Sequence, residues 1–300
     1  MTTIPADVIK WFREVFRTCN ERISEKITNG PNTPEEQLDL TWIEHLSRFA
    51  SPITLPSSWT VKIQTHYLGG LRHFNRWEVA DIGVLLFIRR GGKLERCKVA
   101  LLQSKRLYPT NSRVSEELKV DYEIGFARLA DPEDLSRSIA TEAEFKFSES
   151  SKYGALLTGS DQVAAITEYE QQSNLRIYYQ LYNPWSVPLT QRVPLSSYQS
   201  PTGELTHGVR ILPSSVVHDV LAAHAKGAKP MLSEFAVGER GVPAYGWPLE
   251  SFITDEFLSC REGSIFEAIS DQRIQRLFYR RSGPIAAAIA ITIEAPEEAG

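Results

Sequence analysis

The stretch that decides the fold is VADIGVLLFI, residues Val79–Ile88, which a short turn joins to KVALLQSK, residues Lys98–Lys105. Both runs are apolar enough to predict strands that are buried within a sheet. The turn begins Arg89-Arg90-Gly91-Gly92-Lys93, and its shortness predicts that the two strands are antiparallel neighbours. In that arrangement the start of the first strand lies beside the end of the second.

Helical and strand-like patterns flank this pair of strands. Apolar residues recur at helical spacing over residues 6–28, and similar patterns predict helices over residues 113–130 and 161–172. Alternation over residues 60–68 predicts a strand, and the aromatic-rich run Leu175–Tyr182 predicts another.

The motif Thr33-Pro34-Glu35-Glu36 predicts where a second helix begins. Thr33 is the expected cap, Pro34 suits the first helical position, and Glu36 completes a capping box. An apolar stripe continues to about Phe49, where we expect the helix to end. Glu35 falls on the core-facing stripe, whereas Glu36 is turned away from it by about 100°.

The composition is that of a folded globular chain. Its 300 residues are 42% hydrophobic and 23% charged, which excludes a disordered chain, a collagen-like chain and a coiled coil. The net charge of −4 excludes a globally basic nucleic-acid coat protein but allows a local basic groove. Cys19, Cys97 and Cys260 form no C-x-x-C motif, which favours a reducing cytoplasm over a disulfide scaffold or a structural zinc site.

No membrane segment is expected. The longest candidate, Pro284–Ile293, falls short of the roughly 20 apolar residues that span a bilayer. After residue 190 the patterns weaken, with prolines breaking the chain into short pieces and helices expected over residues 216–226 and 265–281. We therefore expect a core over residues 1–190 and a mainly helical C-terminal region over residues 191–300. Whether that region is a second domain or packs as part of the first stays open.

Polar residues stand at the ends of the two deciding strands. Asp81 opens the first strand, and Gln103 and Lys105 lie two apart near the end of the second, so they share a face. Carboxylate and amide oxygens suit Mg²⁺ or Mn²⁺, and a nearby lysine can orient water and offset phosphate charge. Taken singly, Asp81 could cap a backbone group, and the other two could form a solvated strand end.

With these residues in this order, the sequence resembles the PD-(D/E)xK nuclease superfamily. The resemblance covers roughly residues 33–106 and extends to the strand at 175–182. Gln103-Ser104-Lys105 is similar to the Gln-x-Lys variant of Mrr-type nucleases, while Ala80 stands where a proline often precedes the aspartate. The resemblance implies an α/β fold with a restriction-endonuclease-like core, in which helices flank a mixed central sheet.

The resemblance also implies roles for individual residues. Asp81, Gln103 and a helix glutamate would hold Mg²⁺ or Mn²⁺, and Lys105 would position the attacking water and stabilise the transition state. Glu35 is the preferred helix glutamate and Glu36 the alternative. The expected catalytic set is thus Asp81, Gln103, Lys105 and Glu35.

Basic residues near this set are candidates for nucleic-acid contacts. Arg72, His73 and Arg76 lie in a Gly-rich basic-aromatic loop just before Asp81, and Arg106 follows Lys105. An ordinary exposed connection is the alternative interpretation of the loop.

Two functions from different classes are compatible with these features. The first is a metal-dependent nuclease that hydrolyses phosphodiester bonds, with DNA as the expected substrate and RNA left open. Restriction or anti-phage defence, with a helicase or ATPase as partner, is the setting that the resemblance suggests. The second is a catalytically inactive nuclease-fold subunit that binds or scaffolds, because the neutral Gln103 replaces the commoner carboxylate.

Overall fold

The computed structural model describes residues 3–68, 79–110, 143–193, 195–239, 241–266, 268, 270–278 and 283–297. Most strands within these ranges belong to one large mixed sheet, and a smaller sheet lies apart from it. The strands are β1 (Ile53–Thr54), β2 (Thr60–Tyr67), β3 (Ala80–Arg90), β4 (Lys93–Tyr108), β5 (Ala143–Phe147), β6 (Lys152–Tyr153), β7 (Ile177–Tyr182), β8 (Leu189–Val193), β9 (Arg210–Pro213), β10 (Trp247–Pro248), β11 (Ser264–Phe266) and β12 (Ile285–Ala295).

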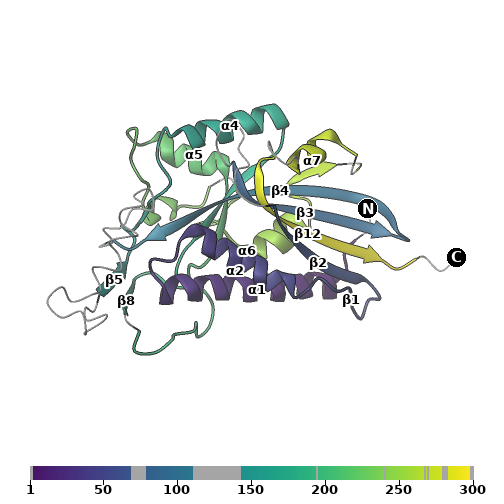
Figure 1. Cartoon of the computed structure of the whole chain (residues 1–300), viewed down its shortest axis with the longest axis horizontal. Helices are drawn as coiled ribbons and strands as arrows, with labels where there is room; N and C mark the ends of the chain where they lie inside the picture. The colour runs from purple at the N-terminus through teal and green to yellow at the C-terminus, as the bar shows by residue number, and fades with distance from the viewer. Residues whose placement is uncertain are drawn as a thin grey trace.

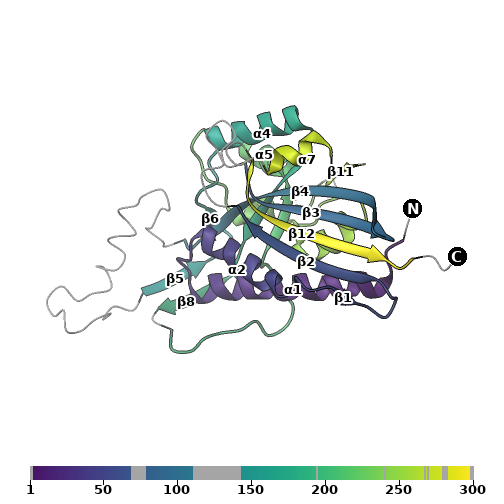
Figure 2. The ribbon, with the colours of Figure 1, turned by 45° about the vertical axis from the view of Figure 1, so that its right-hand side comes forward.

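Helices cover both faces of the large sheet. Figure 1 shows α1 and α2 along one side of the sheet and α4 and α5 along the other, and Figure 2 shows the same layers after rotation. The helices are α1 (Ala6–Asn29), α2 (Glu35–Ser47), α4 (Asp161–Ser173), α5 (Ser214–Ala222), α6 (Leu249–Ser251) and α7 (Gln272–Leu277), with a 3₁₀ turn η1 (Leu232–Phe235) and a π turn η2 (Phe252–Phe257).

Within the described ranges the large sheet has ten strands. Their order is β1-β2-β12-β3-β4-β7-β9-β10, while β6 and β11 also pair with β4, and β5 and β8 form the separate sheet. β12 lies between β2 and β3, antiparallel to the first and parallel to the second. β4 is antiparallel to β3 and parallel to β7. The expected α/β class with a mixed central sheet flanked by helices is therefore confirmed.

The elements before residue 190 match the sequence patterns closely. The helices expected over residues 6–28 and 161–172 are α1 and α4, and the strands over 60–68 and 175–182 are β2 and β7. The two deciding strands are longer than expected, so the turn between them is reduced to Gly91-Gly92. Both glycines have positive φ, which a tight turn requires and glycine adopts without strain. The helix expected over residues 113–130 lies outside the described residues.

The chain after residue 190 differs from the expectation of a mainly helical addition. It supplies β9, β10, β11 and β12 to the large sheet itself. The helix expected over residues 265–281 is replaced by β11 and the short α7. The run that was too short to cross a membrane is β12, in the interior of the sheet. Its partners lie far away along the chain, so no local pattern reveals its place.

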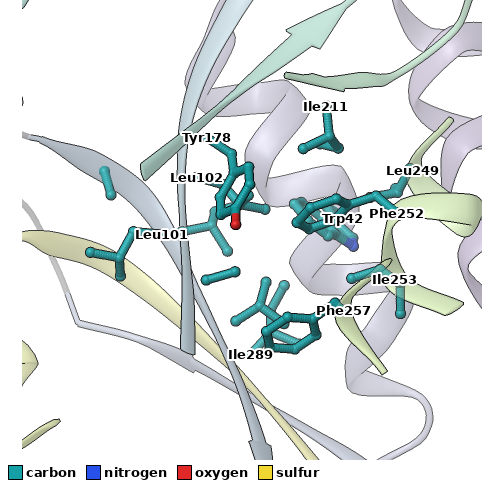
Figure 3. Packing of buried hydrophobic residues seen from close by; sticks show 14 of the residues in the cluster. Trp42, Leu101, Leu102, Tyr178, Ile211, Leu249, Phe252, Ile253, Phe257 and Ile289 are labelled. Atoms are coloured by element: carbon teal, nitrogen blue, oxygen red, sulfur yellow. The ribbon is translucent and has the colours of Figure 1, made fainter. Parts of the chain in front are cut away.

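The core lies on both faces of the sheet, against α1, α2 and the α6–η2 segment on one face and against α4 and α5 on the other. Nearly all apolar side chains of β3, β4 and β12 are buried, because helices cover both faces of these strands. Figure 3 shows part of this core, in which Trp42 of α2, Leu102 of β4, Tyr178 of β7, Ile211 of β9, and Leu249, Phe252 and Phe257 of the α6–η2 segment belong to one buried cluster. None of the helices in the described ranges is both long and apolar enough to cross a membrane.

One buried histidine makes the fold sensitive to acid. The His207 side chain is 6% exposed, and its ring lies 5.0 Å from the ring of Tyr245, centroid to centroid. Burial and, as the smaller cause, the nearby Arg210 charge together lower the pKa of His207 to about 4. The folded state therefore keeps this imidazole neutral in mildly acidic solution.

We predict that stability falls between pH 6.5 and pH 4 and that His207 contributes to the fall. In the unfolded chain His207 takes up a proton near pH 6.5, whereas in the folded chain it does so only near pH 4. Acid therefore favours the unfolded state by at most about 1.4 kcal/mol per pH unit in this window. Urea unfolding of His207→Gln across the window should show a shallower pH dependence than the wild type.

His66→Gln is the matched control, because His66 is exposed on β2. Its pH dependence should follow the wild type. A His207→Gln curve parallel to the wild type would show that this imidazole is not held neutral by the fold.

Candidate active site

The β3–β4 pairing brings Asp81 and Gln103 together. Ile82 lies opposite Leu102, so Asp81 and Gln103 are the next residues outward on each strand. Gln103 Nε2 donates a hydrogen bond to Asp81 Oδ2 at 2.6 Å, and the Ser104 backbone N–H donates to the same oxygen at 2.6 Å. The proximity that the short turn predicted is thus present in the structure.

Helix α2 adds Glu35 to this pair. Lys105 Nζ lies 3.5 Å from Glu35 Oε2, and the Arg106 backbone N–H donates to Glu35 Oε1 at 2.8 Å. Glu36 is exposed, so the structure brings the preferred glutamate, and not the alternative, to the end of β4. Asp81, Gln103, Lys105 and Glu35 therefore lie together where β3 begins and β4 ends.

The start of α2 differs from the expected capping box. Pro34 occupies the cap position, no side chain caps the helix, and Glu35 is its first residue. The preceding segment is held instead by Arg106, whose guanidinium donates to the carbonyls of Pro31 and Thr33. Glu35 is thus free of a capping role, and its carboxylate turns to β4.

Two residues outside the predicted set, Asp39 and Tyr182, complete the site together with Ser104. Asp39 Oδ1 accepts hydrogen bonds from Ser104 Oγ at 2.6 Å and from the hydroxyl of Tyr182. A signal for Asp39 was present, since it lies one helical turn after Glu35 and shares its face. Tyr182 ends β7, which is parallel to the end of β4.

Negative charge accumulates at this end of the sheet. Burial raises the pKa of Asp81 well above its usual value, and the Asp39 and Glu35 charges raise it further, while Lys105 opposes them. Burial also raises the pKa of Asp39 to about 7, against the hydrogen bonds from Ser104 and Tyr182. An additional positive charge beside Asp81 would stabilise the ionised carboxylates.

The donor set fits a divalent cation in part. Gln103 is 2% exposed, and its Oε1 accepts no hydrogen bond from any described residue. A buried acceptor without a donor costs about 1–3 kcal/mol, and here it stands beside the Asp81 carboxylate. Both are oxygens of the kind that Mg²⁺ or Mn²⁺ binds. In the described ranges, however, no three His, Cys, Asp or Glu side chains are grouped so as to hold a metal ion.

Arg106, one of the residues expected to contact nucleic acid, is buried. Arg106 is 1% exposed, and besides its carbonyl contacts its guanidinium lies 4.1 Å from the centre of the Tyr108 ring. Its guanidinium is therefore enclosed within the protein, where it holds the segment before α2. Arg72, His73 and Arg76 lie outside the described residues.

Comparison of the chain with protein-family models, with curated proteins and with solved structures found no match. The chemistry of the site must therefore be inferred from its own residues. Those residues are the half-buried carboxylate of Asp81, the unpaired amide oxygen of Gln103, the buried Lys105 and a second carboxylate, Glu35, from α2.

We predict that substitutions of Gln103 respond to metal. Gln103→Glu places a second carboxylate beside Asp81, so the metal-free protein should lose about 1–3 kcal/mol of unfolding free energy. Mn²⁺ should restore this loss, because a bound cation would offset the charge of the two carboxylates. Gln103→Leu removes the acceptor, and its melting temperature should not respond to Mn²⁺.

Gln191→Glu is the control. Gln191 is likewise buried with an unpaired Oε1, but it lies on β8 of the separate sheet. It should lose stability without recovery in Mn²⁺. Equal Mn²⁺ responses of Gln103→Glu and Gln191→Glu would contradict a cation site at Gln103.

We also predict that Arg106 contributes to stability and not to DNA affinity. Arg106→Ala should lower the unfolding free energy by about 3 kcal/mol or more, because it removes charged hydrogen bonds to two carbonyls and the contact with Tyr108. Arg89→Ala, at the exposed hairpin end, should change it by less than about 1 kcal/mol. Unfolding and DNA titrations below both melting temperatures test this. If Arg106→Ala binds DNA more weakly but keeps the stability of the wild type, the prediction that Arg106 serves stability is wrong.

Proposed function

We propose that this chain is a metal-dependent nuclease that hydrolyses phosphodiester bonds. The observation that carries the proposal is the convergence of Asp81, Gln103, Lys105 and Glu35 at the adjoining ends of β3, β4 and α2. The residue types and their order along the chain resemble the PD-(D/E)xK nucleases. We propose that the fold belongs with their restriction-endonuclease-like core.

The residues divide the chemistry between them. Asp81 and the unpaired Oε1 of Gln103 would hold Mg²⁺ or Mn²⁺, with Glu35 contributing through water or a second ion. The bound cation would supply positive charge against the phosphate oxygens. The ammonium of Lys105 orients the attacking water and stabilises the charge that grows on phosphate. Its contact with Glu35, 3.5 Å between Nζ and Oε2, keeps the ammonium at the end of β4.

DNA is the substrate we propose, with RNA as the alternative for the assay. The chain is acidic overall, so a polyanion must meet a local basic surface, for which Arg72, His73 and Arg76 are the sequence candidates. A role in restriction or anti-phage defence, in the cytoplasm and with a helicase or ATPase partner, belongs to the same proposal.

A second candidate function is supported by one observation. Among the described residues, no three His, Cys, Asp or Glu side chains are grouped so that they could hold a metal ion. The Gln103 side chain is also neutral, whereas a carboxylate is the commoner ligand at its position. A nuclease fold of this kind could serve as a binding or scaffold subunit that does not cut. Metal titration separates the two candidates, since the scaffold needs no cation.

We predict that the wild-type chain cleaves plasmid DNA in Mg²⁺ or Mn²⁺ and that Asp81→Asn and Lys105→Met each reduce the rate at least about 100-fold. Asp81→Asn should also remove Mn²⁺ binding in calorimetry. Lys93→Met is the matched control, because Lys93 is exposed at the other end of β4, and it should cleave at the wild-type rate.

Single-stranded DNA and RNA of the same length should be assayed in parallel. Wild-type rates in folded Asp81→Asn would contradict the mechanism. A wild-type chain that neither cleaves nor binds Mn²⁺, with or without nucleic acid, would favour the scaffold.

A further inference from the structure

A series of side-chain hydrogen bonds next to the proposed site joins α2, β4 and β7. Gln180 Nε2 donates to the hydroxyl of Tyr182, and that hydroxyl donates to Asp39 Oδ1. The Ser104 hydroxyl donates to the same oxygen of Asp39 at 2.6 Å. Gln180 lies opposite Ser104 in the parallel pairing of β7 with β4, so this series of hydrogen bonds begins and ends on neighbouring strands.

Ser104 connects these hydrogen bonds to the proposed site. It stands between Gln103 and Lys105, and its backbone N–H donates to Asp81 Oδ2 at 2.6 Å. Asp39 therefore holds the hydroxyl of Ser104, and the backbone N–H of Ser104 holds Asp81. Any rotation of β4 at Ser104 would move Gln103 and Lys105 as well, because their backbones are continuous with it.

The residues that surround Asp39 in this network are buried. Ser104, Tyr182 and Gln180 are each 0% exposed, so water cannot replace the hydroxyl contacts to Asp39 without opening the site. Among the described residues, Asp39 accepts hydrogen bonds from these two hydroxyls and forms none with Asp81, Gln103 or Lys105. It is thus placed to hold Ser104 and Tyr182 through their hydroxyls.

We propose that Asp39 is a positioning residue that, with Tyr182, holds Ser104 so that Asp81, Gln103 and Lys105 keep their productive geometry. The role in the reaction rests on the proposed nuclease function. The structural part, that the Asp39 acceptor fixes the Ser104 backbone, does not depend on it. Misplacement of reacting groups by about 1 Å can cost about 100-fold in rate.

Three substitutions test the proposal. Asp39→Leu removes the acceptor, Asp39→Asn keeps an acceptor oxygen without the charge, and Tyr182→Phe removes one donor. Exchange of the Ser104 amide proton, followed by NMR in the metal-free full chain, reports the geometry without any activity. We expect at least about 10-fold faster exchange in Asp39→Leu, an unchanged rate for Leu86 in the middle of β3, and near-native exchange in Asp39→Asn.

Kinetics supply the second readout. Asp39→Leu should lower kcat for DNA cleavage in Mn²⁺ by about 10- to 100-fold while KM stays within about 3-fold, because substrate contacts are untouched. Asp39→Asn should recover most of kcat. Glu44→Leu, an exposed position on the same helix, is the control and should match the wild type in every measurement.

Two results would overturn the proposal. The first is native Ser104 exchange and native kcat in folded Asp39→Leu. The second is loss of Mn²⁺ binding in Asp39→Asn as complete as in Asp81→Asn, which would make Asp39 a metal ligand. If Asp39→Leu does not fold, Tyr182→Phe decides with the same exchange and kinetic criteria. If the wild type does not cleave, the nuclease proposal and the role in the reaction both fail, and Ser104 exchange still decides the structural part.

Discussion

The end of β4 carries polar side chains that cannot reach water, and the surrounding structure is arranged to supply their partners. Every residue of this strand from Cys97 onward is buried. A buried polar group without a partner costs several kilocalories per mole, and an unpaired buried charge costs more. The four consecutive polar residues are Gln103, Ser104, Lys105 and Arg106, and their partners come from Asp81, Asp39, Glu35 and the carbonyls of Pro31 and Thr33.

This requirement explains why α2 packs where it does. Apolar contacts such as that of Trp42 hold its buried face to the core, but they do not fix which turn of the helix meets which residue of β4. The polar contacts supply that register, because Glu35 and Asp39 each match one position on the strand. One acceptor, Gln103 Oε1, is left without a partner among the described residues. Gln180 Oε1 on β7 likewise accepts no hydrogen bond from a described residue, but Gln103 Oε1 stands beside the Asp81 carboxylate, where a bound cation would satisfy it.

The sheet provides a rigid base for the cluster. β3 and β4 are flanked by β12 on one side and β7 on the other, so neither deciding strand is an edge of the sheet. β12 inserts between β2 and β3 although it is the last strand of the chain. Formation of the central sheet therefore requires residues 285–295 to reach residues 60–90. Contacts between residues so far apart in sequence carry a large loop-closure entropy cost, which must be overcome before the site can form.

Local patterns determined the elements that do not depend on distant partners. Hydrophobic periodicity located α1 and β2, and the glycine turn set the β3–β4 hairpin, which brought Asp81 beside Gln103. Helical spacing likewise favoured Glu35 over Glu36. Only the tertiary structure placed β12, buried Arg106 and recruited Asp39 with Tyr182. The physical reason is range: periodicity and turns act over a few residues, whereas strand order and the partner of a buried charge depend on packing between segments far apart in the chain.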